Sequence, residues 1–211
     1  MNTDLIKYIT FFSLFIVCIN INGKIMLDEN DKLVSPLPKP YDGLVYSVDD
    51  LKSFIVSTVK SNKQPIIIFG ANWCPDCRIF SGTMDIPKIK SYIDDHFAIL
   101  YIDVKRYEIN MQLMEEFGIP SAEGIPRVLV FDKRMNLINN SNTTEWRTAR
   151  ERSSQEIFDF FQNKKLNLLK MGFRFKFQAA DKSLTDEEID QIMDKVISDS
   201  MALDGISIEG L

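Results

Sequence analysis

Residues 66–78 read Ile66-Ile67-Ile68-Phe69-Gly70-Ala71-Asn72-Trp73-Cys74-Pro75-Asp76-Cys77-Arg78. The first four residues are β-branched or aromatic and lie between Pro65 and Gly70, which is typical of a buried strand. A polar corner follows, and two cysteines separated by two residues stand where a helix would begin. The stretch therefore predicts a strand, a tight corner and a helix that opens on a Cys-x-x-Cys pair.

The two cysteines of this stretch are predicted to be redox-active. A sulfur at a helix start lies near unpaired backbone N–H groups and the positive end of the helix dipole, which favours thiolate over thiol. A thiolate attacks the disulfide of a partner, and a second thiol resolves the mixed disulfide that forms. We therefore interpret Cys74 as the nucleophile and Cys77 as the resolving thiol.

A Cys-x-x-Cys pair also occurs as half of a structural zinc site, which needs about four ligands. The chain has three cysteines and one histidine, so only Cys18 and His96 are left to complete such a site. We predict no metal and no other cofactor, and we interpret His96 as structural. A structural disulfide between Cys74 and Cys77 is a further alternative, although so short a loop contributes little chain-entropy stabilisation.

The segment Trp73-Cys74-Pro75-Asp76-Cys77 resembles the active-site signature of the thioredoxin superfamily, with Pro-Asp in place of the commoner Gly-Pro. A second match lies downstream, in Phe117-Gly118-Ile119 and in Gly124-Ile125-Pro126-Arg127-Val128-Leu129-Val130-Phe131. The resemblance covers roughly residues 47–165. It implies an α/β, thioredoxin-like fold, in which helices flank a central mixed sheet.

The resemblance also implies a function, that of a thiol–disulfide oxidoreductase acting on protein thiols and disulfides. It implies that Pro126 follows a cis peptide bond, faces the cysteines and, with the backbone of Ile125, presents the substrate strand. The predicted catalytic residues are Cys74 and Cys77, and the predicted substrate-binding residues are Trp73, Pro75, Asp76, Ile125 and Pro126.

The chain departs from the family at Ile68, where thioredoxins carry a buried acidic residue six positions before the first cysteine. Without that carboxylate, nothing at this position can accept the proton of the resolving thiol. Asp76 could substitute in part, but its charge also disfavours a nearby thiolate. Residues 120–123 form an additional loop that resembles exported members of the family.

The sequence favours a reductant, or general disulfide exchange, over a strong oxidase. No cationic residue lies between the cysteines to lower the pKa of Cys74 strongly, although Arg78 stands just beyond them. A non-catalytic thioredoxin-fold module that binds or assembles partners through its C-terminal extension is the alternative function.

The N-terminal residues predict export. Residues 9–19 are almost wholly apolar but are shorter than a membrane-spanning helix of about 20 residues, which is typical of a signal-peptide core. We predict that residues 1–23 are a signal peptide or short anchor and that the protein is periplasmic or secreted, with tethering by residues 9–19 as an alternative. In such a compartment, a membrane redox partner could supply electrons.

The rest of the chain divides into three predicted parts: a proline-rich, extended and mobile linker at 24–43, a thioredoxin-like domain at 44–166 and an extension at 167–211. Within the domain, strands are expected at 44–46, 66–69, 97–104 and 127–131, with a hairpin partner at 136–139. Helices are expected after Ser47, from Cys74 to about Thr83, at 88–95, at 107–117 and after Ser153 or Ser154. The long apolar run at 97–104 predicts a strand covered on both faces.

The C-terminal extension predicts a β-α-β arrangement, in which Thr185 and Glu188 form a capping box. Residues 173–178 and 181–188 resemble part of the anticodon-binding domain of the bacterial phenylalanyl-tRNA synthetase beta chain. From Lys170 to Leu211 there are five Lys and Arg against nine Asp and Glu, a net of −4, and the whole chain carries −5. This charge argues against nucleic acid as a partner. We expect the extension either to pack on the main domain or to pair with a second chain through an exposed strand edge, which would give a homodimer.

Overall fold

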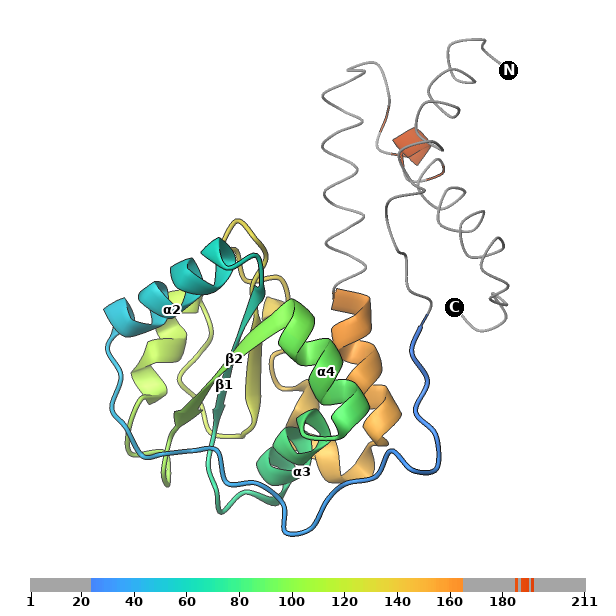
Figure 1. Cartoon of the computed structure of the whole chain (residues 1–211). Helices are drawn as coiled ribbons and strands as arrows, with labels where there is room; N and C mark the ends of the chain where they lie inside the picture. Colours follow the sequence, from blue (N-terminus) through green and yellow to red (C-terminus); the bar gives the residue numbers. More distant parts are fainter. Residues whose placement is uncertain (1–23, 165–184, 186, 190, 192–211) are drawn as a thin grey trace. The chain divides into compact units, whose positions relative to one another are not determined.

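The computed structural model describes residues 24–164, 185, 187–189 and 191. One compact unit consists of Met26–Asn163, and the other of Met1–Ile25 together with Lys164–Leu211. In the first unit, β1 (Gln64–Gly70), β2 (Phe97–Asp103) and β3 (Arg127–Val130) form a sheet in the order β2-β1-β3 (Figure 1). Strand β2 is parallel to β1 and β3 is antiparallel to it, so the predicted mixed α/β sheet is confirmed.

The central strand β1 is the predicted apolar run, and every residue in it is buried. Helix α2 (Val48–Lys60) covers one face of the sheet, and α3 (Pro75–Met84), α4 (Pro87–His96) and the helical residues 154–164 cover the other (Figure 1). A strand enclosed in this way requires apolar side chains on both faces, which explains the uninterrupted sequence of Ile66 to Phe69.

The helices begin where the capping residues predict. Ser47 Oγ accepts a hydrogen bond from Asp50 N at 3.2 Å, and the Asp50 carboxylate accepts one from Ser47 N at 2.8 Å. Ser153 and Glu156 form the same reciprocal pair at the start of residues 154–164, at 3.2 and 2.7 Å. Each box satisfies backbone donors that a helix start leaves unpaired.

Aromatic side chains fill the core beneath α3. Trp146 is 2% exposed, and its ring centroid lies 5.6 Å from that of Phe80 and 5.2 Å from that of Phe160. Trp146 belongs to the 3₁₀ segment η3 (Glu145–Glu151). This contact therefore fixes η3 against the helix that carries the cysteines.

The strand predicted at residues 44–46 does not form. Gly43 has a φ of +79°, and Leu44 and Val45 are exposed. Asn110 takes the place of a neighbouring strand, since its Oδ1 accepts a hydrogen bond from Tyr46 N at 3.0 Å and its Nδ2 donates one to Leu44 O at 2.8 Å. The backbone is thus satisfied without a ladder.

The helix predicted at 107–117 is shorter than expected. Tyr107 and Asn110 have φ values of +65° and +60°, which no regular α-helix contains, and only the 3₁₀ segment η1 (Met111–Phe117) follows. The Asn110 side chain, bonded to Asp103 O at 2.8 Å, holds this irregular turn. Gly118 ends η1 with a φ of +70°, so the predicted glycine cap is confirmed.

Two strand predictions also need correction. Residues 98–101 of β2 are only partly buried, because β2 lies at an edge of the described sheet. The hairpin partner at 136–139 contributes a single bridge, between Phe131 and Leu137, and η2 (Asn140–Asn142) follows soon after it. The Asp132 carboxylate accepts hydrogen bonds from the backbone of Arg134 and Asn136, and this turn replaces an extended ladder.

Residues 26–43, predicted as a mobile linker, are extended but attached to the domain. Arg78 donates a hydrogen bond to Leu37 O at 2.9 Å, and Lys88 pairs with Asp31 at 2.6 Å. Tyr41 is buried. The compact unit thus begins at Met26, well before the predicted domain boundary.

In the other unit the described residues are few. Thr185 N donates a hydrogen bond to Glu188 Oε2 at 2.9 Å and Glu188 N donates one to Thr185 Oγ1 at 3.3 Å, so the predicted capping box is confirmed. The remaining predictions for residues 1–23 and 165–211 lie outside the described residues. Within the described parts of the chain, no helix is both long and apolar enough to cross a bilayer.

Candidate active site

The two cysteines lie at the corner between β1 and α3. Cys74 is the N-cap of α3, its backbone N–H donates to Ala71 O at 3.1 Å, and its Sγ accepts a hydrogen bond from Cys77 N at 3.3 Å. Pro75 occupies the first turn, where its fixed φ suits a helix and no backbone donor is needed. Both thiols are free. The corner is therefore built from neighbouring residues alone, as the sequence predicted.

The environments of the two thiols differ. Cys74 is 4% exposed, and the hydrogen bonds that it receives, first from the Cys77 thiol and then from the Cys77 N–H, lower its pKa to about 7 against the opposing effects of burial and of Asp76. Cys77 is completely buried, and burial followed by the hydrogen bond to Cys74 raises its pKa. Near pH 7 a large share of Cys74 is thereby in the thiolate form, while Cys77 stays protonated.

The loop before β3 lies against Cys74. The Ile125–Pro126 peptide bond is cis, as the resemblance implied, and Cys74 Sγ lies 3.7 Å from Ile125 O. The side chains of Ile125 and Pro126 are buried. Arg127 supports this loop, since its guanidinium donates hydrogen bonds to Gly124 O at 2.9 Å and Ala122 O at 3.2 Å. The structure thus brings Ile125 and Pro126 together with the cysteine pair.

Trp73 and Pro75 lie at the surface beside Cys74. Trp73 is 45% exposed, but its Nε1 donates a hydrogen bond to Lys105 O at 2.6 Å. Its ring meets Tyr107 edge-on at 6.0 Å, and the Arg106 guanidinium lies 5.7 Å from it. The indole is therefore held in one orientation and presents an apolar surface near the nucleophile.

Asp76, predicted as a substrate-binding residue, is buried in the first turn of α3. Its carboxylate is buried and accepts hydrogen bonds from Arg150 N at 2.9 Å and from Arg150 Nε at 3.1 Å. The same hydrogen bond and the charge of Asp76 raise the pKa of Arg150. Asp76 therefore faces the protein, and its charge beside Cys74 is balanced by a cation.

That cation was not found from the sequence, because Arg150 lies 74 residues from Asp76. Arg78, the cation that the sequence did suggest, donates its hydrogen bonds to Leu37 O and Pro38 O instead. Nothing in the local pattern around residue 150 indicates the pairing. The charge next to the cysteines depends on how η3 folds back onto α3.

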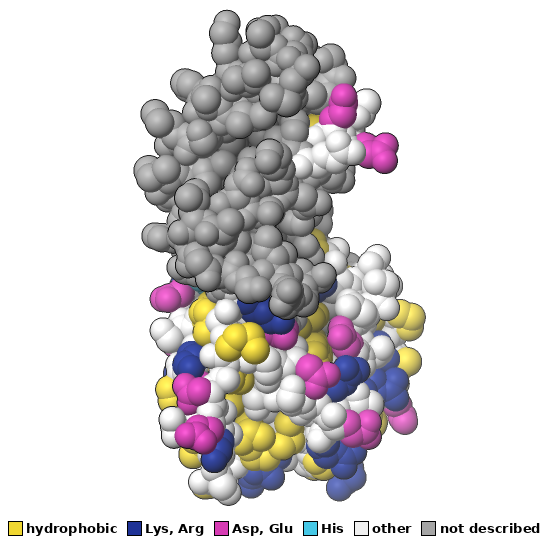
Figure 2. Space-filling model, turned by 90° about the vertical axis from the view of Figure 1, so that its right-hand side faces the viewer, with side chains coloured by type: hydrophobic (Ala, Val, Ile, Leu, Met, Phe, Trp, Pro, Cys, Tyr) yellow, Lys and Arg dark blue, Asp and Glu magenta, His cyan; other side chains and the backbone are white. Residues whose placement is uncertain are grey.

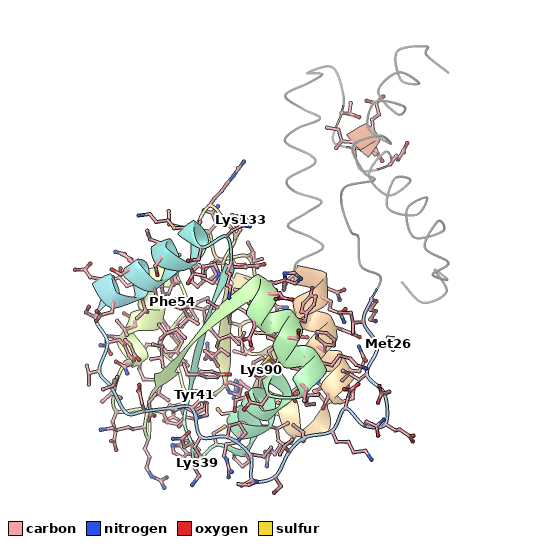
Figure 3. All side chains as sticks on the ribbon, viewed as in Figure 1. Met26, Lys39, Tyr41, Phe54, Lys90 and Lys133 are labelled. Carbon is pink, nitrogen blue, oxygen red and sulfur yellow. The ribbon has the colours of Figure 1, made fainter. Side chains whose placement is uncertain are left out.

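Tyr41 is a second residue that the sequence did not indicate. It lies on the N-terminal segment, at the end of the sheet where α3 begins (Figure 3). A Cβ on Gly70 would overlap the Tyr41 hydroxyl, so the last residue of β1 must be glycine for the ring to fit. A glycine at the end of a buried strand is the signal that could have suggested such a close approach.

Outside the cysteine pair, the charged side chains of the described residues are dispersed (Figure 2). Among the residues that the structure describes, no group of three His, Cys, Asp or Glu side chains is arranged to hold a metal ion. On the face drawn in Figure 2, basic and acidic side chains alternate with small hydrophobic groups. The arrangement at Cys74 and Cys77 can perform two-electron thiol–disulfide chemistry.

Comparison with solved structures relates this geometry to a known protein. A disulphide isomerase from Xylella fastidiosa Temecula1 is 31% identical, has a TM-score of 0.55, and the match covers 61% of this chain and 98% of that one. A protein of unknown function from Pseudomonas aeruginosa is 15% identical, with a TM-score of 0.33 and coverage of 55% and 77%. No family model and no curated protein matches the chain.

Proposed function

The chain belongs to the thioredoxin-like family of thiol–disulfide oxidoreductases, and on that premise we propose that it exchanges disulfides with protein substrates through Cys74 and Cys77. The observation that carries this proposal is the asymmetry of the two thiols. One has its pKa lowered to about 7 at the edge of the protein, and the other is fully buried behind it with its pKa raised. This is what a nucleophile and a resolving thiol require.

The reaction proceeds in two steps. The Cys74 thiolate attacks one sulfur of a substrate disulfide, the substrate S–S bond breaks, and the departing substrate thiolate takes a proton from solvent. Cys77 then loses its proton and attacks Cys74 Sγ, which forms the Cys74–Cys77 disulfide and releases the second substrate thiolate. The protein is oxidised by two electrons and the substrate is reduced by two.

The substrate chain would lie between Trp73 and the cis-proline loop. Trp73 offers the exposed apolar surface, and Ile125 offers a backbone carbonyl next to Cys74 Sγ. Pro126 has no N–H, so the Ile125–Pro126 peptide offers the substrate only an acceptor. Main-chain recognition of this kind suits an enzyme that accepts more than one protein substrate.

The pKa of Cys74 supports reduction or general exchange over strong oxidation. A value of about 7 matches that of thioredoxin, at about 7, and lies far from the about 3.5 of the strong oxidant DsbA. The similarity to a disulphide isomerase supports thiol–disulfide exchange in general. We place the activity in an exported compartment on the evidence of residues 9–19, with a membrane dithiol partner as the electron source.

Capture of substrates tests the proposal. In Cys77→Ser the resolving thiol is absent, so the first step should proceed and stop at a mixed disulfide between Cys74 and a substrate. The full chain carrying Cys77→Ser should accumulate disulfide-linked adducts with cellular proteins, and dithiothreitol should reduce these adducts. The matched variant Cys74→Ser should form none. Equal amounts of adduct in both variants, or none in either, would contradict the proposed enzymatic activity and favour the alternative function of a partner-binding module.

A further inference from the structure

The Tyr41 hydroxyl is buried in the same core cluster as Cys74 and Cys77. Tyr41 is 3% exposed, and among the described residues no group lies in hydrogen-bonding geometry with its hydroxyl. A buried polar group without a partner costs free energy, and its persistence in a folded protein requires an explanation. Phenylalanine would fill the same space without that cost.

The position of the hydroxyl is enforced by three contacts. Asn72 holds the Tyr41 backbone from both sides, as its Oδ1 accepts from Tyr41 N at 3.2 Å and its Nδ2 donates to Tyr41 O. Gly70 leaves room for the phenol oxygen, and Tyr101 meets the ring edge-on at 5.5 Å. Asn72 stands two residues before Cys74, so the clamp and the active-site corner move together.

The pKa shifts of Tyr41 and Cys77 indicate which of the two groups donates a hydrogen bond and which accepts it. Burial, and then the charges of Cys77, Tyr101 and Cys74, raise the pKa of Tyr41 well above its usual value. The nearby Tyr41 hydroxyl lowers the pKa of Cys77, against the larger effect of burial. The phenol therefore keeps its proton at neutral pH and acts as a donor, and the thiolate of Cys77 is the acceptor that suits it.

We propose that Tyr41 is a third catalytic residue, which donates a hydrogen bond to the Cys77 thiolate during resolution of the mixed disulfide. The inference rests on the proposed exchange activity. As Cys77 gives its proton to solvent and attacks Cys74 Sγ, the Cys77–Cys74 bond forms, the bond from Cys74 to the substrate breaks, and the substrate sulfur leaves as a thiolate. Tyr41 keeps its proton throughout.

This role of Tyr41 would compensate in part for the missing carboxylate at position 68, where this chain has Ile68. A carboxylate would accept the proton of the resolving thiol, whereas a phenol stabilises the thiolate once that proton has left. A charge-assisted hydrogen bond is stronger than a neutral one, so the hydroxyl offsets part of the cost of ionising this buried thiol. The hydroxyl has an acceptor of this kind only while Cys77 is a thiolate.

Tyr41→Phe tests the proposal, because it removes the hydroxyl and keeps the ring. The reduced full-length protein is mixed with oxidised glutathione, and samples are quenched with acid at intervals and analysed by mass spectrometry. The masses distinguish the Cys74–glutathione adduct from the Cys74–Cys77 disulfide, so the rate of adduct formation and the rate of closure by Cys77 are measured separately. We expect adduct formation at the wild-type rate and closure about tenfold slower at pH 7. The pH at which closure reaches half its maximum rate should move upward.

Tyr101→Phe is the matched control, since it removes a neighbouring buried hydroxyl from the ring that packs on Tyr41. It should close at the wild-type rate. A Tyr41→Phe closure rate and pH profile equal to those of wild type would overturn the role of the hydroxyl while leaving the exchange activity intact. Failure of the wild-type protein to form or close the adduct would instead contradict the proposed function itself.

Discussion

Two regions contribute to the site in different ways. The corner at residues 70–77 places the nucleophile by short-range hydrogen bonds. Cys74 N donates to Ala71 O, and Cys77 N donates to Cys74 Sγ. The N-terminal segment and η3 are distant in sequence, and they add Tyr41 and Arg150 through contacts with Asn72 and Asp76. The corner therefore determines which sulfur reacts, and the distant segments adjust the charge and proton affinity around it.

This difference has a physical origin. A helix start satisfies its own geometry, because the N-cap and the next three residues bond to one another. A charge or hydroxyl from far along the chain is placed only if a whole segment packs correctly. Trp146 does this for η3 by packing on Phe80, and Asn72 does it for Tyr41. Changes in the two regions should accordingly have effects of different kinds.

The largest expected effect is on activity and lies in the corner. Cys74→Ser should reduce the rate of insulin disulfide reduction to that of the dithiol donor alone, because serine supplies no thiolate at neutral pH. Its far-ultraviolet circular dichroism should match that of wild type. Residual catalysis above the donor rate in a folded Cys74→Ser variant would show that the corner does not determine the nucleophile.

The next effect is on stability and lies in η3. Trp146→Ala removes a fully buried indole and should lower the free energy of unfolding by about 3–5 kcal/mol in urea titrations. Trp73→Ala, at the chain's other tryptophan, is the matched control and should cost at most about 1 kcal/mol, because that side chain is 45% exposed and lies outside the core. Equal losses for the two variants would contradict the role of Trp146 as the anchor of η3.

A smaller loss of stability is expected where the two regions meet. Gly70→Ala places a methyl group against the Tyr41 ring and should cost about 1–3 kcal/mol. Because the clash is with that ring, most of the loss should be recovered when Tyr41→Ala is added, and a double-mutant cycle measures this recovery. Additive losses in the cycle would show that Tyr41 does not occupy the space above Gly70.

The smallest effect is on thiol reactivity. Arg150→Met removes the cation but leaves Asp76 charged, so the pKa of Cys74 should rise above about 7 and alkylation by iodoacetamide at pH 6 should slow by about two- to fivefold, as for a surface ion pair. Asp76→Asn removes the opposing charge and should speed alkylation at pH 6. At pH 9, where Cys74 is fully ionised, all three proteins should react alike. A rate unchanged at pH 6 in both variants would exclude the ion pair as a modulator of Cys74.

The sequence predicted what depends on local chemistry. The buried strand at Ile66 to Phe69, the caps at Ser47 and Ser153, the cis bond before Pro126 and the cysteine corner all follow from short-range patterns or motifs. In each case the residues that form the feature are neighbours in sequence or belong to a recognisable motif.

The sequence missed what depends on side chains meeting across the fold. Residues 44–46 have strand-forming side chains, but Asn110 satisfies their backbone. The proline-rich segment carries the compositional signal of a linker, yet buried Tyr41 and the contacts made by Arg78 and Lys88 attach it to the domain. Asp76 lies in the active-site motif, and its partner is 74 residues away. No local pattern records such pairings.

The reduction potential of the Cys74–Cys77 couple tests the central claim most directly. The protein is equilibrated in glutathione buffers of graded ratio, and the fraction in the disulfide form is measured after acid quenching. We predict a reversible couple near about −270 mV, the value of a thioredoxin-like reductant. A value near about −120 mV would identify a disulfide donor, and a pair that never closes reversibly would contradict the enzyme altogether.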